Sequence, residues 1–84
     1  MKLSSIALLE AISEGDCDAV YDLICSHFHL QALDRIYVDV YPAIGISKYA
    51  ILWQDGYTYS WNSAVGWEEP RVTDTPETEL LIRT

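Results

Sequence analysis

Lys and Arg are scarce in this sequence: there are five of them against 13 Asp and Glu, which leaves a formal net charge of -8 over 84 residues. A field of this sign repels nucleic acid and anionic membranes, and it attracts basic protein surfaces. We therefore expect no direct binding to nucleic acid or to a membrane. The expected kind of partner is a basic protein.

Long apolar runs and glycine-rich segments are missing as well. The N-terminal apolar run covers residues 6–9 only, because Glu10 ends it and Glu14 comes soon after, whereas a membrane span needs about 18–20 apolar residues. The run is also too short for a secretory signal, so we expect a cytoplasmic protein. The glycines, at positions 15, 45, 56 and 66, are isolated, so there is no glycine-rich phosphate loop.

Candidate metal ligands and nucleophiles are few. Cys25 and His29 would lie one helical turn apart, with His27 between them. A closed zinc site needs four ligands, and this pair also lacks a third group to orient it for nucleophilic catalysis. Cys17 would stand about 12 Å from Cys25 along a helix, too far for a disulfide. We expect no disulfide, no metal or other cofactor, and no enzymatic activity.

The residues that are present favour a folded domain. Half of them are hydrophobic and 12% are aromatic, whereas disordered chains are poor in aromatic and β-branched residues. A chain of this length forms one domain, so we assign residues 1–84 to a single unit.

Periodicity predicts two helices in the first third of the chain, over residues 4–14 and 16–30. Leu3, Ile6, Leu9 and Ile12 recur every three residues, which is typical of an amphipathic helix. Gly15 then suits the end of the first helix. Asp16 suits the N-cap of the second helix.

The period changes to two after Asp34, which predicts strands over residues 36–41, 48–54 and 57–61. Asp55-Gly56 favours a two-residue hairpin turn between the second and third strands. The expected fold is α+β: an N-terminal helix pair packed on a three-stranded antiparallel meander, with a short C-terminal element. Residues 71–73 suit a short edge segment, and residues 76–83 suit either a helical turn or a strand.

Aromatic residues concentrate on the predicted strands. The alternation places five of them on one sheet face, namely Tyr49, Trp53, Tyr57, Tyr59 and Trp61. Tyr and Trp bring contact area at low entropic cost, so part of this face is expected to remain accessible as a protein interface. The alternative is that these residues are simply good strand formers.

The acidic residues fall into two blocks with little local counter-charge. Between residues 10 and 22 there are five acids and no Lys or Arg, and between residues 68 and 79 there are five more against Arg71 alone. Exposed helices usually interleave basic residues at i+4 spacing, so the missing cations indicate a use beyond solubility. The expected partner-binding residues are Glu10, Glu14, Asp16, Asp18, Asp22, Glu68 and Glu69.

The leading hypothesis is a non-enzymatic inhibitor whose carboxylates dock on the basic groove of a nucleic-acid-binding protein. In size, acidity and lack of catalytic motifs the chain resembles the class of phage-encoded inhibitors of bacterial defence, including anti-CRISPR proteins and other DNA mimics. The resemblance rests on composition over the whole chain, so it assigns no residue a role. An antitoxin or immunity-type protein for a basic nuclease shares the same physics. The alternative from another class is a structural or assembly subunit that binds a partner or forms a homodimer through its aromatic sheet face.

Overall fold

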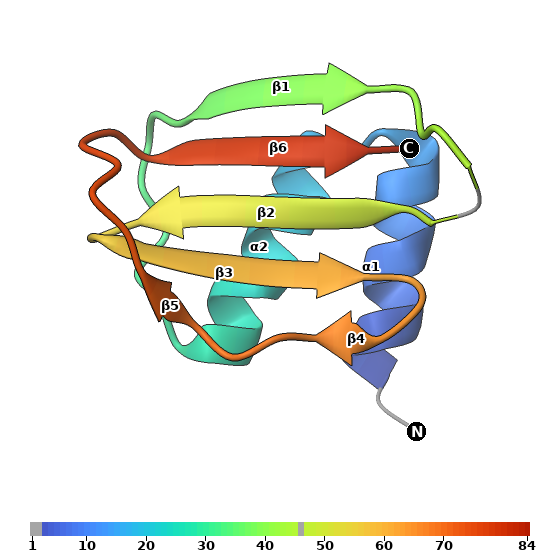
Figure 1. Cartoon of the computed structure of the whole chain (residues 1–84), viewed down its shortest axis with the longest axis horizontal. Helices are drawn as coiled ribbons and strands as arrows, with labels where there is room; N and C mark the ends of the chain where they lie inside the picture. The colour runs from blue at the N-terminus through green and yellow to red at the C-terminus, as the bar shows by residue number, and fades with distance from the viewer. Residues whose placement is uncertain (1–2, 46) are drawn as a thin grey trace.

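The structure is a computed structural model that describes residues 3–45 and 47–84. Its elements, in chain order, are α1 (Leu3–Glu14), α2 (Cys17–Phe28), β1 (Tyr37–Tyr41), β2 (Tyr49–Gln54), β3 (Tyr57–Asn62), β4 (Gly66–Trp67), β5 (Arg71–Val72) and β6 (Glu79–Arg83). Figure 1 shows both helices packed behind one sheet, whose front face is covered by no helix of the described residues. The predicted α+β class with an N-terminal helix pair is confirmed. Neither helix in the described ranges is long and apolar enough to cross a bilayer.

Local capping chemistry separates the two helices, as predicted. Gly15 has φ +70°, and its N–H donates to the Ile12 carbonyl at 3.0 Å, which is how a left-handed residue ends a helix. The Asp16 carboxylate accepts the backbone N–H of Ala19 at 3.2 Å and caps α2. At the other end of α2, His29 is left-handed and its N–H donates to the Cys25 carbonyl.

The hairpin between β2 and β3 also forms as predicted. Asp55 and Gly56 both have positive φ, of 54° and 80°, which is the geometry that a two-residue turn needs. The antiparallel pairing of β2 with β3 begins with Gln54 opposite Tyr57, next to the turn, and extends to Tyr49 opposite Asn62.

The predicted pairing of the first strand within the meander is wrong. Strand β6 lies between β1 and β2, in the order β1-β6-β2-β3-β4, with β5 beside β3. β1 pairs with β6 in parallel, and β6 pairs with β2 antiparallel. The connection over residues 42–48 is longer than a tight hairpin loop, so it can span the roughly 10 Å, two strand spacings, that make room for β6. Residues 76–83, for which the sequence allowed a helical turn or a strand, therefore contain a strand.

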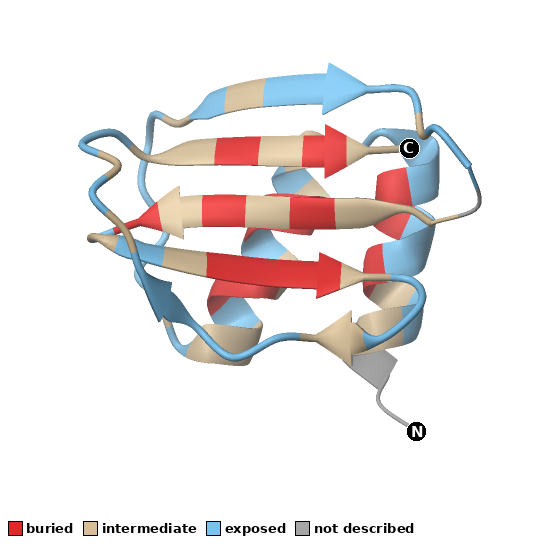
Figure 2. Cartoon of the chain, viewed as in Figure 1, coloured by how far each residue is buried: buried red, intermediate tan, exposed pale blue. Residues whose placement is uncertain are grey.

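The core lies between the sheet and the helices, as the burial colours in Figure 2 show. The sheet contributes alternate residues of β2 and β6, and the helices contribute one face each. Its fully buried large apolar side chains are Leu8, Ile12, Val20, Ile24, Leu52, Leu80 and Ile82. Burying one Leu or Ile side chain contributes about 1.5–3 kcal/mol, so this layer is the main source of stability.

A buried polar network ties the segment between α2 and β1 to the sheet. The Tyr21 hydroxyl donates to Gln54 Oε1 and accepts the Leu33 N–H, both at 2.8 Å. Gln54 is 2% exposed, and its Nε2 donates to the Gln31 carbonyl at 2.8 Å. Burial raises the pKa of Tyr21 above its usual value of 10.0, so the hydroxyl keeps its proton at neutral pH and remains a donor.

We predict that Tyr21→Phe lowers the free energy of unfolding by about 1–3 kcal/mol, because it leaves Gln54 Oε1 and the Leu33 N–H without their partner. Urea denaturation measures this change. Tyr57→Phe is the matched control, because Tyr57 is 43% exposed, and it should change stability by less than about 0.5 kcal/mol. Equal effects of the two substitutions would contradict the role given to the Tyr21 hydroxyl.

Candidate functional site: an acidic groove between the helices

The helix pair carries a groove rimmed by carboxylates, which we call the acidic groove. It has a volume of about 400 Å³ and is lined by Ala7, Glu10, Ala11, Glu14, Asp16, Ala19, Asp22 and Leu23. The structure thus brings together four of the seven predicted acidic residues, two from α1, one from the turn between the helices and one from α2. All four are exposed to solvent.

The spacing of small and acidic residues explains the shape of this groove. Ala7 and Ala11 lie one turn apart on α1, and Glu10 and Glu14 lie one turn apart beside them. On α2, Ala19 is a small residue in the lining. These short side chains keep the floor of the groove low between carboxylates that reach solvent. The charge pattern alone did not reveal the part played by these alanines. Their i, i+4 spacing beside a similarly spaced acidic pair was the signal.

The described residues that line the groove include no Lys or Arg to compensate its charge. Lys48 approaches α1, but its Nζ donates to the Ser13 hydroxyl at 2.9 Å. Glu14 ends α1, where the negative end of the helix dipole disfavours a carboxylate. The groove therefore keeps a negative field at some cost to the stability of α1.

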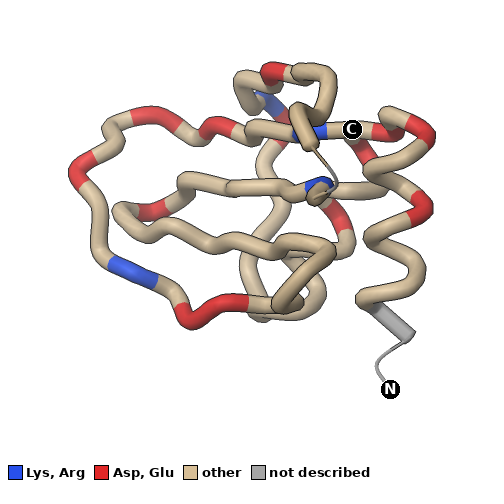
Figure 3. The backbone as a smooth tube through the Cα atoms, turned by 45° about the vertical axis from the view of Figure 1, so that its right-hand side comes forward, with Lys and Arg blue, Asp and Glu red and all other residues tan. Residues whose placement is uncertain are grey.

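The other predicted acidic residues lie elsewhere. Asp18 lines a different hollow, next to the start of β1. Glu68 and Glu69 follow β4, in the connection to β5, and Glu68 Oε2 accepts a hydrogen bond from the Ser60 hydroxyl at 2.5 Å. Figure 3 shows acidic positions spread over several parts of the chain. No described residue of the second block lines the acidic groove.

The prediction that five aromatic residues share one face is wrong. A two-residue turn pairs Gln54 with Tyr57, so odd positions of β2 lie opposite even positions of β3. Tyr49 and Trp53 consequently lie on the outer face. Tyr57, Tyr59 and Trp61 belong to the helix-facing side, where Tyr59 and Trp61 are buried in the core. The Asp55-Gly56 turn had already specified this register.

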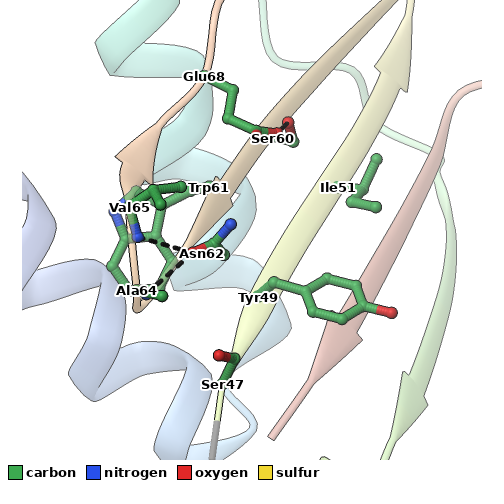
Figure 4. Close-up of a pocket in the computed structure, with 9 residues that line it drawn as sticks. All are labelled: Ser47, Tyr49, Ile51, Ser60, Trp61, Asn62, Ala64, Val65 and Glu68. Carbon is green, nitrogen blue, oxygen red and sulfur yellow. Dashed lines mark hydrogen bonds between the residues drawn. The ribbon is translucent and has the colours of Figure 1, made fainter.

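The outer face holds a smaller hollow of about 320 Å³ near the β3–β4 turn. Figure 4 shows the residues that line it, with Ser60 and Glu68 side by side and the Asn62 side chain turned toward the backbone of the turn. Asn62 Oδ1 accepts the N–H groups of Ala64 and Val65 at 2.9 and 2.8 Å. The Ser60, Asn62 and Glu68 side chains thus bond within the chain, so this hollow is a weaker candidate than the acidic groove.

The Cys25 thiol is poorly suited to nucleophilic chemistry. Cys25 is buried, and burial raises the pKa of its thiol above the usual value of 9.0, so little thiolate forms at neutral pH. His29 is an exposed helix cap, while His27 stacks on Trp67 with ring centroids 3.8 Å apart. Within the described residues, no three His, Cys, Asp or Glu side chains come close enough to hold a metal ion.

The chain matches no protein-family model, and neither a curated protein nor a solved structure is significantly similar to it. The residues themselves therefore supply the arguments about function.

We predict that Glu14→Gln raises the free energy of unfolding by about 0.5 kcal/mol at low salt, because it removes a charge from the C-terminal end of α1 and from beside Glu10. Thermal and urea unfolding measure the gain, and it should vanish in about 1 M salt. Glu77→Gln, in the exposed connection before β6, is the control and should leave stability unchanged. A gain of the same size at both sites would show that net charge, and not the acidic groove, is responsible.

Proposed function

We propose that this protein is a non-enzymatic binding module whose acidic groove docks on the basic groove of a nucleic-acid-binding protein and so inhibits it. The observation that carries the proposal is the convergence of Glu10, Glu14, Asp16 and Asp22 around one hollow, to which the described part of the chain contributes no cation. Asp16 also caps α2, so the remaining three carboxylates are the ones to test. The proposed setting is the cytoplasm, and the proposed biological role is that of a phage-type inhibitor of bacterial defence.

The spacing of the carboxylates supports mimicry of nucleic acid. Glu10 and Glu14 are one helical turn apart, about 6 Å along the axis. Neighbouring phosphates of one DNA strand are separated by a comparable distance, because each step combines a rise of about 3.4 Å with a turn around the axis. The two carboxylates therefore carry negative charge at an interval similar to that of neighbouring phosphates.

The net charge of -8 supports the same proposal through kinetics. Long-range attraction speeds the encounter with a basic surface, and added salt weakens it. The field also repels nucleic acid itself, so the proposed target is the protein and not its nucleic-acid ligand.

The outer sheet face supports a second candidate function, an assembly subunit. Tyr49, Ile51 and Trp53 from β2 lie there beside Leu81 from β6, and all four are half-buried. Such a face suits a protein contact. The net charge opposes homodimerisation, so this candidate favours a different chain as the partner.

We predict that reversing Glu10, Glu14 and Asp22 to Lys lowers retention of the partner from a host lysate at least about tenfold, because it turns the attractive field of the groove into a repulsive one. Immobilised wild-type and variant chains are compared at about 50 and 500 mM salt, and retained proteins are identified by mass spectrometry. Retention by the wild type should fall at the higher salt, and the retained protein should bind nucleic acid.

Two control variants separate the candidate functions. Reversal of Asp74 and Glu77 places positive charge in the exposed connection before β6, and it should preserve most of the retention. Trp53→Ala should also preserve it. If Trp53→Ala abolishes retention while the groove reversals do not, the assembly-subunit function replaces the inhibitor.

A further inference from the structure

Strand β1 is a long open edge of the sheet. Among residues 3–45 and 47–84, its one strand partner is β6. The opposite edge is made of the two-residue strands β4 and β5, which are too short to accept much pairing. Figure 2 shows β1 as the most exposed of the long strands. Four of its five residues are exposed. A free edge of this kind is a template for an added strand.

The free hydrogen-bonding groups on this edge belong to Val38 and Val40. The Tyr37 N–H donates to the Thr78 carbonyl at 3.0 Å, and the Tyr41 carbonyl accepts the Thr84 N–H at 3.1 Å. Residues 37 and 41 therefore direct their backbone groups toward β6. Alternate residues of a strand point these groups in opposite directions, so Val38 and Val40 direct theirs outward.

Acidic side chains flank these groups on both sides of the strand. Asp39 is exposed at the centre of β1 on the outer face. On the helix side, a hollow of about 490 Å³ is lined by Asp18, Asp34, Arg35, Ile36, Tyr37 and Val38. On the outer face, β6 adds Glu79 beside Tyr37 and Arg83 over the Tyr41 ring, so this edge region carries four carboxylates against two guanidinium groups.

The apolar side chains of the edge strand are also incompletely covered. Val38 and Val40 share the face of buried Leu80 and Ile82, yet Val40 is 47% exposed. Side chains of an added strand would lie beside both valines and complete this row.

We propose that β1 binds an extended segment of a basic protein as an additional strand, with the pattern apolar–Lys/Arg–apolar. The Lys or Arg lies opposite Asp39 on the outer face, and its apolar neighbours lie beside Val38 and Val40. Charge complementarity identifies the occupant. A second copy of this chain is disfavoured, because the antiparallel register that pairs Val38 with Val40 puts Asp39 opposite its equivalent. This surface is separate from the acidic groove, so the inference goes beyond the proposed function.

The probe is an acetylated and amidated peptide, Lys-Thr-Val-Lys-Val-Thr-Lys, titrated into the full ¹⁵N-labelled chain. We expect the largest amide shifts at Val38 and Val40. Val40→Pro removes an outward N–H without touching the β6 ladder, and it should raise the Kd at least about tenfold. Val72→Pro is the matched control at another exposed edge valine, 78% exposed on β5, and should change the Kd less than about twofold.

A charge exchange keeps the test decisive even if Val40→Pro fails to fold. Asp39→Lys should weaken the peptide at least about threefold and strengthen, by a similar factor, a peptide with Glu in place of the central Lys. Unchanged affinities in both pairings, or shifts confined to the acidic groove, would overturn the proposal. Dilution-dependent shifts at Val38 and Val40 without peptide would also overturn it, in favour of a second copy. Because reversal of Glu10, Glu14 and Asp22 leaves this edge intact, failure here and failure of the groove are separable results.

Discussion

The insertion of β6 between β1 and β2 is the constraint on which the rest of the structure depends. β6 is the only partner of β1 within the described residues. Leu80 and Ile82 are buried under the helices, while Leu81 lies on the outer face. A strand that is apolar on both faces suits the interior of a sheet, so β6 occupies an inner position and β1 the edge. The free edge and the composition of the outer face both result from this placement.

Features decided by adjacent residues could be predicted from the sequence. Gly15 and Asp16 end one helix and cap the next, and Asp55-Gly56 closes the hairpin, because each acts through its own backbone conformation. The position of β6 could not be predicted in this way, because it depends on pairing with β1 about 40 residues earlier, and no local signal distinguishes that partner. The division of the aromatic residues between two faces, in contrast, could have been predicted. The two-residue length of the predicted turn fixes which positions of the two strands lie opposite each other, so no distant contact is needed.

The candidate site was predictable in composition but not in shape. The acidic block in residues 10–22 was evident, and the structure gathers four of its five members around one groove. The fifth, Asp18, is on the same helix as Asp22 but contributes to the hollow beside β1. Helix α2 therefore supplies carboxylates to two separate surfaces, one between the helices and one at the sheet edge. Both surfaces are rich in carboxylates, and they differ in what else they present: the groove presents side chains alone, whereas the edge also presents backbone hydrogen-bonding groups.

The central claim is that the chain occupies the nucleic-acid groove of a basic protein, and equilibrium competition tests it most directly. A labelled oligonucleotide bound to the retained partner is titrated with this chain at physiological salt, and its release is followed by fluorescence anisotropy. We expect complete release, with a midpoint that rises in proportion to the oligonucleotide concentration. Formation of a ternary complex, with the oligonucleotide still bound at saturation, would contradict the claim.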